Sequence, residues 1–228
     1  MGKVVLKLGA DISTDDIYPG RFMATVLPSE TPQFCFADDK AFNTALQQKA
    51  IAPGGIIVGG QIFGCGSSRE QAASTIKGHG LVVIARGFAR IFLQNSINLG
   101  LRTIICPALE AEAGDEIALM PAHVRNVTRS ADFPVVPLPA ARQAIIDAGG
   151  LIAYTRTRLV ADLRTAVSRG ATQGGYGDLD RDGDGDEPPP RGGPVSTPGG
   201  GNLLVLGLGP DGTVWTNPAG LQVNAVVN

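Results

Sequence analysis

Residues 1–169 alternate between short apolar runs and longer segments in which apolar residues recur every three or four positions. The short runs are bounded by Gly or Pro, which is typical of buried strands. They predict strands at residues 3–8, 55–58, 81–85, 103–106, 116–120 and 123–128. The periodic segments predict helices at residues 38–50, 68–77, 88–99, 140–148 and 151–167, and we expect the last helix to close the domain. This alternation predicts an α/β domain of about 165 residues.

The composition changes at Gly170. Half of residues 170–201 are Gly or Pro, and the acidic cluster GDLDRDGDGDEPPP lies among them. Such a segment buries too little apolar surface to order itself, which predicts a flexible, disordered linker. Residues 202–228 contain two β-like runs around a Pro-Asp-Gly turn, which predicts a hairpin too small to be stable alone. The expected organisation is an α/β domain at 1–169, a linker at 170–201 and a β-like tail of unknown role at 202–228.

Charge is distributed unevenly along the chain. Up to Arg169 there are 17 basic and 14 acidic residues, whereas beyond it there are 2 and 7. Neither part clusters basic residues with aromatic ones, which argues against nucleic acid as a partner. The spacing DLDRDG from Asp178 imitates the start of a calcium-binding EF-hand loop. Neither reading frame ends in the closing Glu, so a solvated acidic linker is favoured over a calcium site.

The sequence offers no candidate for membrane insertion. No apolar run approaches the roughly 20 residues that a membrane-spanning helix needs. The N-terminal segment has no apolar stretch followed by a small-residue cleavage site, and Leu6 stands where a myristoylation signal has Ser or Thr. We therefore expect a cytoplasmic protein without a membrane partner.

The chain has three cysteines, Cys35, Cys65 and Cys106, and two histidines, His79 and His123. They form no CxxC pair and no Cys/His pair at the spacing of metal ligands. We therefore expect no metal site and no cofactor held by this chain alone, an iron–sulfur cluster included. Cys35 and Cys106 are expected to be reduced and partly buried.

The segment GGQIFGCGSSREQAA, residues 59–73, joins a glycine-rich loop to a polar helix start. Between a strand and a helix, unpaired backbone N–H groups and the helix dipole attract an anion. The loop lacks the third glycine of the dinucleotide fingerprint and the lysine of a P-loop. Residues Ser67 to Glu70 fit a capping box, but a cap does not require four glycines in eight residues, whereas close approach of a ligand does. Arg69 can hold a carboxylate through two parallel hydrogen bonds.

The same loop carries a resemblance to a known family. GCGSSREQAASTIKGHG and the following VIARGFARIFLQNSINLGL resemble the small subunits of the aconitase superfamily, of the 3-isopropylmalate dehydratase and homoaconitase type. GADISTDDIYPGRFMAT, residues 9–25, is similar to their N-terminal signature, and VRNVTRSADFPVVPLPAARQAIIDAGGLIAY to their C-terminal portion. The resemblance extends from residue 3 to about residue 165, and the tail beyond Gly170 has no counterpart.

The resemblance implies a swivelling β/β/α domain that closes over the active site of a separate large subunit. That partner is expected to carry a four-iron, four-sulfur cluster, and the complex is expected to act on a small dicarboxylate. The resemblance implies that Ser67 is the catalytic base, an alkoxide that removes the proton α to a carboxylate. It also implies that Arg69 binds a substrate carboxylate and that Ser68 adds a hydrogen bond. Thr14 and Asp15 match the residues that line the site in the family.

The residues themselves agree with this chemistry. A hydroxyl acts as a base only when its anion is stabilised, and a helix N-terminus, glycine N–H groups and the adjacent Arg69 supply that stabilisation in a closed, dry site. Neither histidine has the sequence context of a triad, and no G-x-S-x-G elbow occurs, which argues against a serine hydrolase. A non-catalytic module that binds an anion at this loop is the rival interpretation.

The segment after Pro19-Gly20 bears on the substrate. In the family these residues help to sense the variable group of the substrate, and Ala24 stands where a basic residue favours an extra carboxylate. A small apolar residue cannot pair such a charge, so we expect a hydro-lyase that isomerises isopropylmalate in leucine biosynthesis. A homoaconitase or dimethylmalate dehydratase small subunit is the alternative. Arg21 is either a second carboxylate anchor or a surface charge, and Phe22 to Ala24 either accept an alkyl group or belong to the core.

Overall fold

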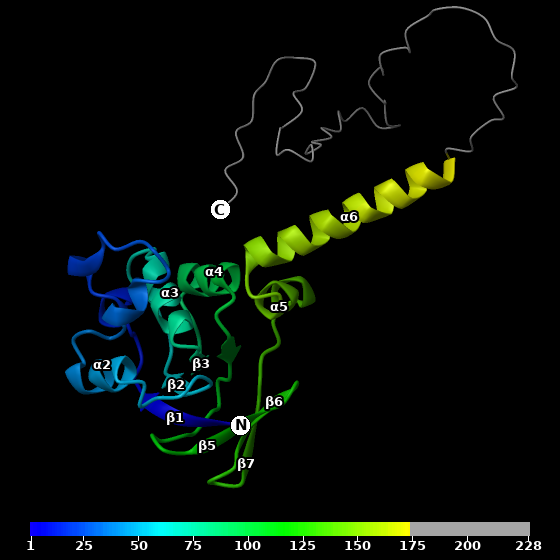
Figure 1. Ribbon diagram of the computed structural model, residues 1–228. Helices are drawn as coiled ribbons and strands as arrows, with labels where there is room; N and C mark the ends of the chain where they lie inside the picture. The colour runs from blue at the N-terminus through cyan, green and yellow to red at the C-terminus, as the bar shows by residue number, and fades with distance from the viewer. Residues whose placement is uncertain (174–228) are drawn as a thin grey trace, which may run out of the picture. The chain divides into compact units, whose positions relative to one another are not determined.

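A computed structural model describes residues 1–173, with side chains described to Thr165. This part of the chain is built on one seven-stranded sheet (Figure 1). The strand order is β4-β3-β2-β1-β5-β6-β7; β1 to β4 pair in parallel, and β5 to β7 form an antiparallel meander that joins the edge of β1. The strands are β1 (Gly2–Lys7), β2 (Ile56–Gly59), β3 (Val82–Ala85), β4 (Thr103–Ile105), β5 (Glu116–Leu119), β6 (His123–Asn126) and β7 (Ala131–Pro134).

Helices connect the parallel strands and follow the meander. They are α1 (Thr14–Ile17), α2 (Lys40–Gln47), α3 (Glu70–Gly78), α4 (Arg90–Leu99), α5 (Ala140–Asp147) and α6 (Leu151–Gln173), with the 3₁₀ turns η1 (Gly20–Phe22) and η2 (Thr31–Phe34). The predicted α/β class is confirmed, and each predicted strand and helix has a counterpart. The elements that the periodicity did not predict are β7, α1 and the two 3₁₀ turns.

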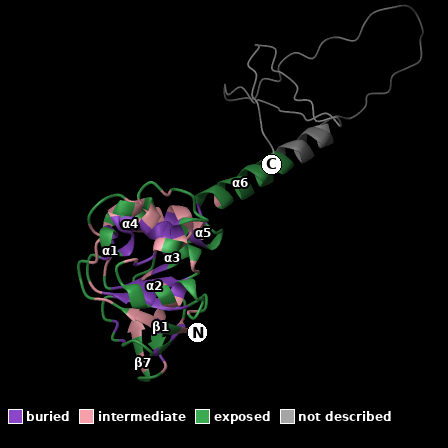
Figure 2. Cartoon of the chain, turned by 60° about the vertical axis from the view of Figure 1, so that its left-hand side comes forward, coloured by how far each residue is buried: buried purple, intermediate pink, exposed green. Residues whose placement is uncertain are grey.

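The two central parallel strands, β2 and β3, are buried on both faces, which explains their continuous apolar sequences. Every residue of β2 and of β3 is buried. Ile57 and Val83 pack in one core cluster with Ile76 of α3 and Phe92 of α4, while Ile56 on the opposite face packs in a second cluster that includes residues of β5 and β6. Figure 2 shows the buried residues in purple within the folded domain, α2 and α3 included. Burial fixes the carboxyl end of β2, from which the glycine-rich loop follows, and the parallel pairing of β1 with β2 places the end of β1, from which α1 follows, at the same edge of the sheet.

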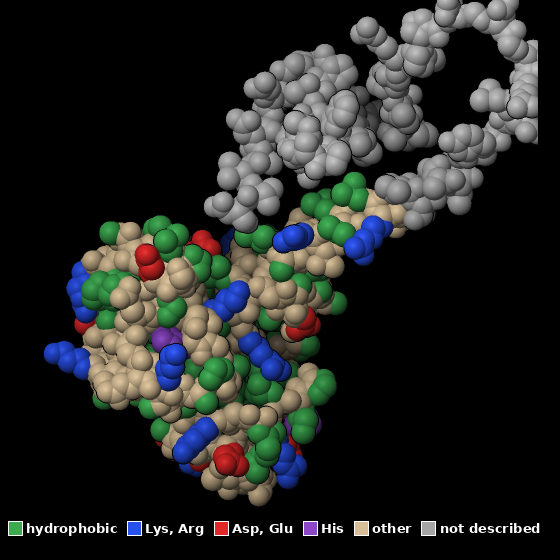
Figure 3. Space-filling view, in the orientation of Figure 1, with side chains coloured by type: hydrophobic (Ala, Val, Ile, Leu, Met, Phe, Trp, Pro, Cys, Tyr) green, Lys and Arg blue, Asp and Glu red, His purple; other side chains and the backbone are tan. Residues whose placement is uncertain are grey.

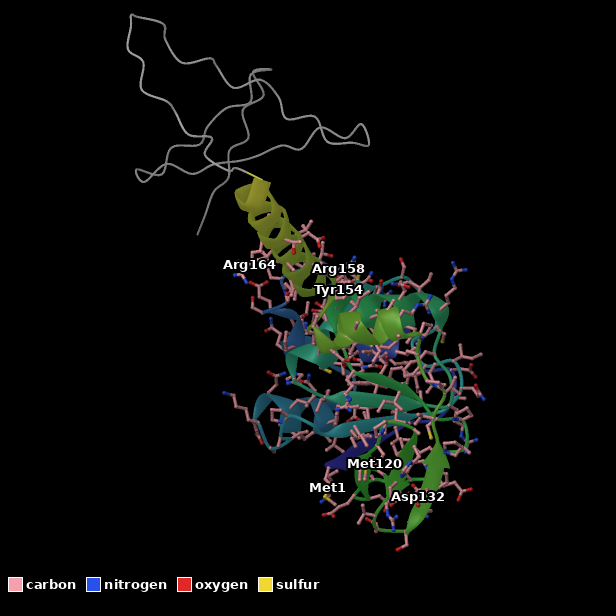
Figure 4. All side chains as sticks on the ribbon, turned by 90° about the vertical axis from the view of Figure 1, so that its right-hand side faces the viewer. Met1, Met120, Asp132, Tyr154, Arg158 and Arg164 are labelled. Carbon is pink, nitrogen blue, oxygen red and sulfur yellow. The ribbon has the colours of Figure 1, made fainter. Side chains whose placement is uncertain are left out.

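The helix α6 does not close the domain as expected. It contacts α4 and α5, but Ile152 is 86% exposed and Leu163 58% exposed, and the helix extends away from the sheet in Figure 1. Hydrophobic and basic side chains share its visible face in Figure 3, and Arg158 lies over the ring of Tyr154, one turn earlier (Figure 4). The helical periodicity predicted the helix correctly. It did not indicate that apolar side chains of α6 stay exposed among the described residues.

The predicted linker and tail lie outside the described residues, except that residues 170–173 continue α6. The acidic spacing from Asp178 also lies outside them. Among the helices of the described part, none is both long and apolar enough to cross a membrane.

Candidate functional site

The glycine-rich loop is held against the loop that follows β1. The backbone N–H groups of Gly64 and Cys65 donate to the carbonyl of Ile12 at 2.7 and 3.0 Å, and the N–H of Thr14 donates to the carbonyl of Cys65 at 2.8 Å. Because β1 and β2 are parallel neighbours, their carboxyl ends lie at the same edge of the sheet. The pairing of the two loops therefore brings the start of α1 to residues 65–69, as the predicted site requires.

An aromatic cluster fixes the base of the loop. Phe63 is fully buried, and its ring centroid lies 5.9 Å from that of Phe88 and 5.4 Å from that of Phe92. Gly64 has a φ of +82°, and a Cβ there would lie 2.2 Å from Cγ of Phe92. Only glycine meets both conditions, since other residues rarely adopt this φ and the ring leaves no space.

The expected capping box at Ser67 to Glu70 is wrong. The helix α3 begins at Glu70 with Arg69 as its N-cap residue, and no side chain caps it. The capping box lies instead on α1, where Ser13 Oγ accepts from the N–H of Asp16 at 3.1 Å and the Asp16 carboxylate accepts from the N–H of Ser13 at 2.8 Å. Ser67 and its neighbour Ser68 are exposed, so these hydroxyls are accessible rather than used to start the helix.

Arg69 and Asp15 form an ion pair between the two loops. Nη1 of Arg69 also donates to the carbonyl of Tyr18 at 3.3 Å, and Oδ1 of Asp15 accepts from the N–H of Gly20 at 3.1 Å. The hydrogen bond from Arg69, aided by the Gly20 N–H, lowers the pKa of Asp15 despite partial desolvation. A Cβ at Gly20 would lie 3.2 Å from Nη2 of Arg69, so glycine leaves room for this approach. The guanidinium is therefore held in its direction by contacts within the chain.

Two further side chains contact the backbone of the serine pair, Ser67 and Ser68. Thr14 is 1% exposed, and its Oγ1 donates to the carbonyl of Ser67 at 3.1 Å. Nδ2 of Asn95, on α4, donates to the carbonyl of Ser68 at 3.3 Å. Sequence reasoning missed Asn95 because a polar residue on an amphipathic helix carries no signal of a long-range contact.

The structure places Arg21 apart from the pair formed by Asp15 and Arg69. Nη1 of Arg21 donates to Oδ2 of Asp38 at 3.1 Å, and its guanidinium lies 4.6 Å from the ring centroid of Phe22. The hydrogen bond from Arg21 lowers the pKa of Asp38. In this conformation Arg21 is an exposed, paired surface charge.

The predicted specificity segment is divided between core and surface. The ring of Phe22 stacks on that of Phe34, with centroids 4.1 Å apart, and packs against the main core cluster. Met23 and Ala24 are exposed. The hydroxyl of Tyr18 donates to the carbonyl of Phe22 at 3.0 Å, which holds this segment beside the site. Met23 and Ala24 are therefore available to a ligand, whereas Phe22 contributes to packing.

The thiols of this chain do not fit an iron–sulfur cluster. Cys35 and Cys106 are fully buried, and burial raises the pKa of Cys35 to about 12 and also raises that of Cys106. Cys65 is half-buried in the glycine-rich loop, with Sγ 3.4 Å from the carbonyl of Asp11. Among the described residues, no group of three or more His, Cys, Asp and Glu side chains is placed to hold a metal ion.

A pocket of about 400 Å³ opens where β1 and β2 end, but it is separate from the predicted site residues. Its lining includes Gly59 and Gly60 with three cations, Lys7, Arg86 and Arg129. Lys7 and Arg129 are paired with carboxylates, so much of the positive charge is neutralised. Two of the four glycines singled out in the sequence, Gly59 and Gly60, thus line this pocket, whose lining contains none of the predicted site residues.

Comparison with known proteins agrees with this geometry. Residues 30–109 match the family model of the aconitase C-terminal domain. The 3-isopropylmalate dehydratase small subunit of Heliobacterium modesticaldum is 40% identical over 161 residues, which are 68% of this chain and 94% of that protein. The corresponding protein of Caldicellulosiruptor bescii is 42% identical over 158 residues, 67% of this chain and 92% of that protein.

A solved structure extends the similarity to the fold. The crystal structure of 3-isopropylmalate dehydratase (LeuD) from Methanocaldococcus jannaschii superposes with a TM-score of 0.65 at 35% identity, covering 72% of this chain and 97% of that one. The mixed α/β sheet, the paired loops and the near-complete coverage of these relatives lead to one conclusion. The chain belongs to the family of 3-isopropylmalate dehydratase small subunits.

Proposed function

We propose that this chain is the small subunit of a heteromeric hydro-lyase that converts 2-isopropylmalate to 3-isopropylmalate by dehydration and rehydration, a step of leucine biosynthesis. The observation that carries the proposal is that Arg69, two residues after Ser67, is held by Asp15. The matched part of this chain also covers nearly the whole length of its relatives. An exposed hydroxyl in the same loop as a half-buried cation suits removal of a proton α to a carboxylate.

Ser67 acts as the base in this proposal. Its Oγ takes the proton from the carbon next to a substrate carboxylate while the hydroxyl leaves the neighbouring carbon, which gives the alkene. On rehydration the hydroxyl bonds to the carbon that lost the proton, and Ser67 returns its proton to the other carbon. The cluster of the large subunit, when bound, would supply the Lewis acid that accepts the hydroxyl. An alkoxide is stable enough for this only when N–H groups and a cation face it and water is excluded. The exposure of Ser67 in the isolated chain means that a partner surface must cover it. We therefore expect each subunit alone to be inactive.

Arg69 binds the substrate carboxylate. Its side chain is only 15% exposed, which strengthens its interaction with an anion. The guanidinium has five N–H donors, and its contacts with Asp15 and Tyr18 leave others for a carboxylate. Asp15 accordingly aims Arg69 instead of contacting the substrate, and Thr14 supports the backbone of Ser67. Ser68 contributes a hydrogen bond from its exposed hydroxyl.

The iron–sulfur cluster implied by the resemblance belongs to the large subunit in this proposal. Cys35 and Cys106 are buried with raised pKa values, and Cys65 belongs to no group of metal-binding side chains among the described residues. The role of this chain is limited to proton transfer at Ser67 Oγ, carboxylate binding at Arg69 and closure over the partner.

The apolar segment favours an alkyl-substituted malate. Met23 is 40% exposed, and Ala24 beside it is exposed as well. Neither can pair a further carboxylate, whereas both can contact a branched alkyl group. Homoaconitate and dimethylmalate are the competing substrates.

Reconstitution tests the function. The chain is mixed with a large subunit of the same family, and turnover of 2-isopropylmalate, dimethylmalate and homoaconitate is compared. We expect turnover only from the mixture, with the highest kcat/KM for isopropylmalate. Preference for homoaconitate would contradict the argument from Ala24. Binding of a dicarboxylate by this chain alone, with no turnover in the mixture, would favour the anion-binding module.

A further inference from the structure

We propose that Asn95 of α4 is a positioning residue for the proposed reaction: together with Thr14 it holds the backbone of the serine pair, so that the Ser67 hydroxyl and the Arg69 guanidinium face the same ligand. This inference rests on the proposed function. Asn95 does not touch the substrate in this account. It acts through the carbonyl of Ser68, to which its Nδ2 donates at 3.3 Å.

The two contacts fix consecutive peptide planes. The carbonyl that Thr14 holds at 3.1 Å belongs to the plane between Ser67 and Ser68, and the carbonyl that Asn95 holds belongs to the plane between Ser68 and Arg69. Because peptide units are rigid, fixing these oxygens restricts ψ of Ser67, both dihedrals of Ser68 and φ of Arg69. These dihedrals decide where the base and the carboxylate-binding group lie relative to each other.

The helix α4 is itself anchored where it presents Asn95. Phe92, three residues earlier on the same face, is 1% exposed and packs against Phe63 and Gly64 at the base of the loop. The face of α4 that packs on the loop thus also carries the donor to Ser68. Of the other polar residues of α4, Gln94 donates from Nε2 to Oδ1 of Asn98 at 2.9 Å.

The loop has few other restraints at this point. Ser67 and Ser68 are exposed, Gly66 before them has a φ of +91°, and α3 begins without a side-chain cap. An uncapped segment next to glycine retains conformational freedom. The donors on α1 and α4 approach from two different elements, so the serine pair is held between them.

The test compares Asn95→Asp with Asn98→Asp in the full chain. Asp has the shape of Asn but no donor, and it places a negative charge against the Ser68 carbonyl, whereas at position 98 it still accepts from Gln94. Amide hydrogen exchange of residues 60–69 is measured on the chain alone, and kcat and KM on the reconstituted complex. Loss of one hydrogen bond is expected to speed exchange about fivefold and to lower kcat more than it changes KM, because Asp15 still aims Arg69. Asn98→Asp is expected to change neither.

Unchanged amide hydrogen exchange in residues 60–69 of Asn95→Asp would overturn the proposal that Asn95 holds the backbone of this loop, whether or not the chain is a hydro-lyase. Faster exchange with an unchanged kcat would overturn the positioning role. If Asn95→Asp does not fold, Asn95→Ala takes its place. Absence of wild-type turnover would show that the proposed function itself fails, and the catalytic role of Asn95 would fail with it.

Discussion

The ion pair between Arg69 and Asp15 joins two loops that lie 54 residues apart in the sequence and follow neighbouring parallel strands. The Asp15 side chain is 59% exposed, while the Arg69 side chain is 15% exposed. The carboxylate therefore lies nearer the protein surface than the guanidinium. In the proposed function, a substrate carboxylate that reaches Arg69 meets a cation held in a fixed direction. We therefore interpret the pair as aiming Arg69 and not as stabilising the fold, since exposed ion pairs contribute little stability.

Replacing Arg69 tests that interpretation. Arg69→Lys keeps the charge but loses the planar pair of donors, so we expect kcat/KM of the reconstituted complex to fall by about tenfold or more. Asp15→Asn removes the aiming charge and is expected to cause a smaller loss. Steady-state kinetics of both variants check this order. A rate and substrate affinity unchanged in Arg69→Lys would make Arg69 a surface charge.

The stability of the folded protein at low pH is expected to depend on Asp115, which anchors the turn before β5. Its carboxylate accepts from the N–H of Glu112 at 2.9 Å and from Asn126 and Arg129 at 2.8 Å each. These bonds lower its pKa from 3.8 to about 2. A lowered pKa means that the carboxylate form stabilises the folded state above pH 3.8 and that this contribution is lost as the pH falls toward 2.

We therefore expect Asp115→Asn to lower the free energy of unfolding at pH 7 and to differ progressively less from the wild type between pH 4 and pH 2. Urea unfolding at several pH values measures this. Asp132→Asn is the matched control, because Asp132 on β7 is exposed (Figure 4) and its contacts with Arg125, at 3.4 Å, and with His123, at 3.6 Å, are longer than those of Asp115. An equal effect of both substitutions at every pH would contradict the assignment.

Thiol labelling checks the loop geometry. Cys65 is half-buried beside the serine pair, whereas Cys35 and Cys106 are fully buried with raised pKa values. In the native protein we expect iodoacetamide to modify Cys65 first, because the thiolate is the reactive form and the other thiols are both inaccessible and protonated. Peptide mapping by mass spectrometry identifies the site. Labelling of Cys35 without denaturant would show that the main core opens more readily than its packing implies.

Removal of the chain beyond Gln173 tests the predicted linker and tail. About two-thirds of this chain matches nearly the whole length of the Heliobacterium modesticaldum relative, and the tail falls outside the resemblance. We expect complex formation and activity to stay within about twofold of the full chain. Gel filtration with the large subunit and a turnover assay measure both properties. Loss of solubility or of the complex would indicate that residues 202–228 cover an apolar surface.

The longer strands and helices were predicted well because burial imposes a regular spacing of apolar residues. Doubly buried strands such as β2 read as unbroken apolar runs, and the helices showed three- and four-residue steps. Short elements have no period to detect: α1 has only four residues, and β7 alternates intermediate and exposed residues and ends at Pro134. The helix α6 was predicted from the same periodicity, but a period does not identify what covers the apolar side.

The site was predicted by residue type but not by contact. Ser67 to Glu70 and Ser13 to Asp16 both have a serine three residues before an acidic residue, and only the second forms a capping box. In the first segment Arg69 is itself the N-cap residue of α3, so Ser67 lies two residues before the cap position. The contacts of Thr14 and Asn95 with the serine carbonyls likewise depend on tertiary packing, which local sequence does not encode.

The most direct test of the account is the turnover of Ser67→Ala in the complex with the large subunit, measured beside the melting temperature of the free chain. Since Ser67 does not cap α3, we expect stability within about 0.5 kcal/mol of the wild type, unchanged complex formation and no detectable turnover of 2-isopropylmalate. Ser130→Ala, at an exposed serine between β6 and β7, is the control and is expected to retain full activity. Substantial turnover by Ser67→Ala would contradict the assignment of Ser67 as the base.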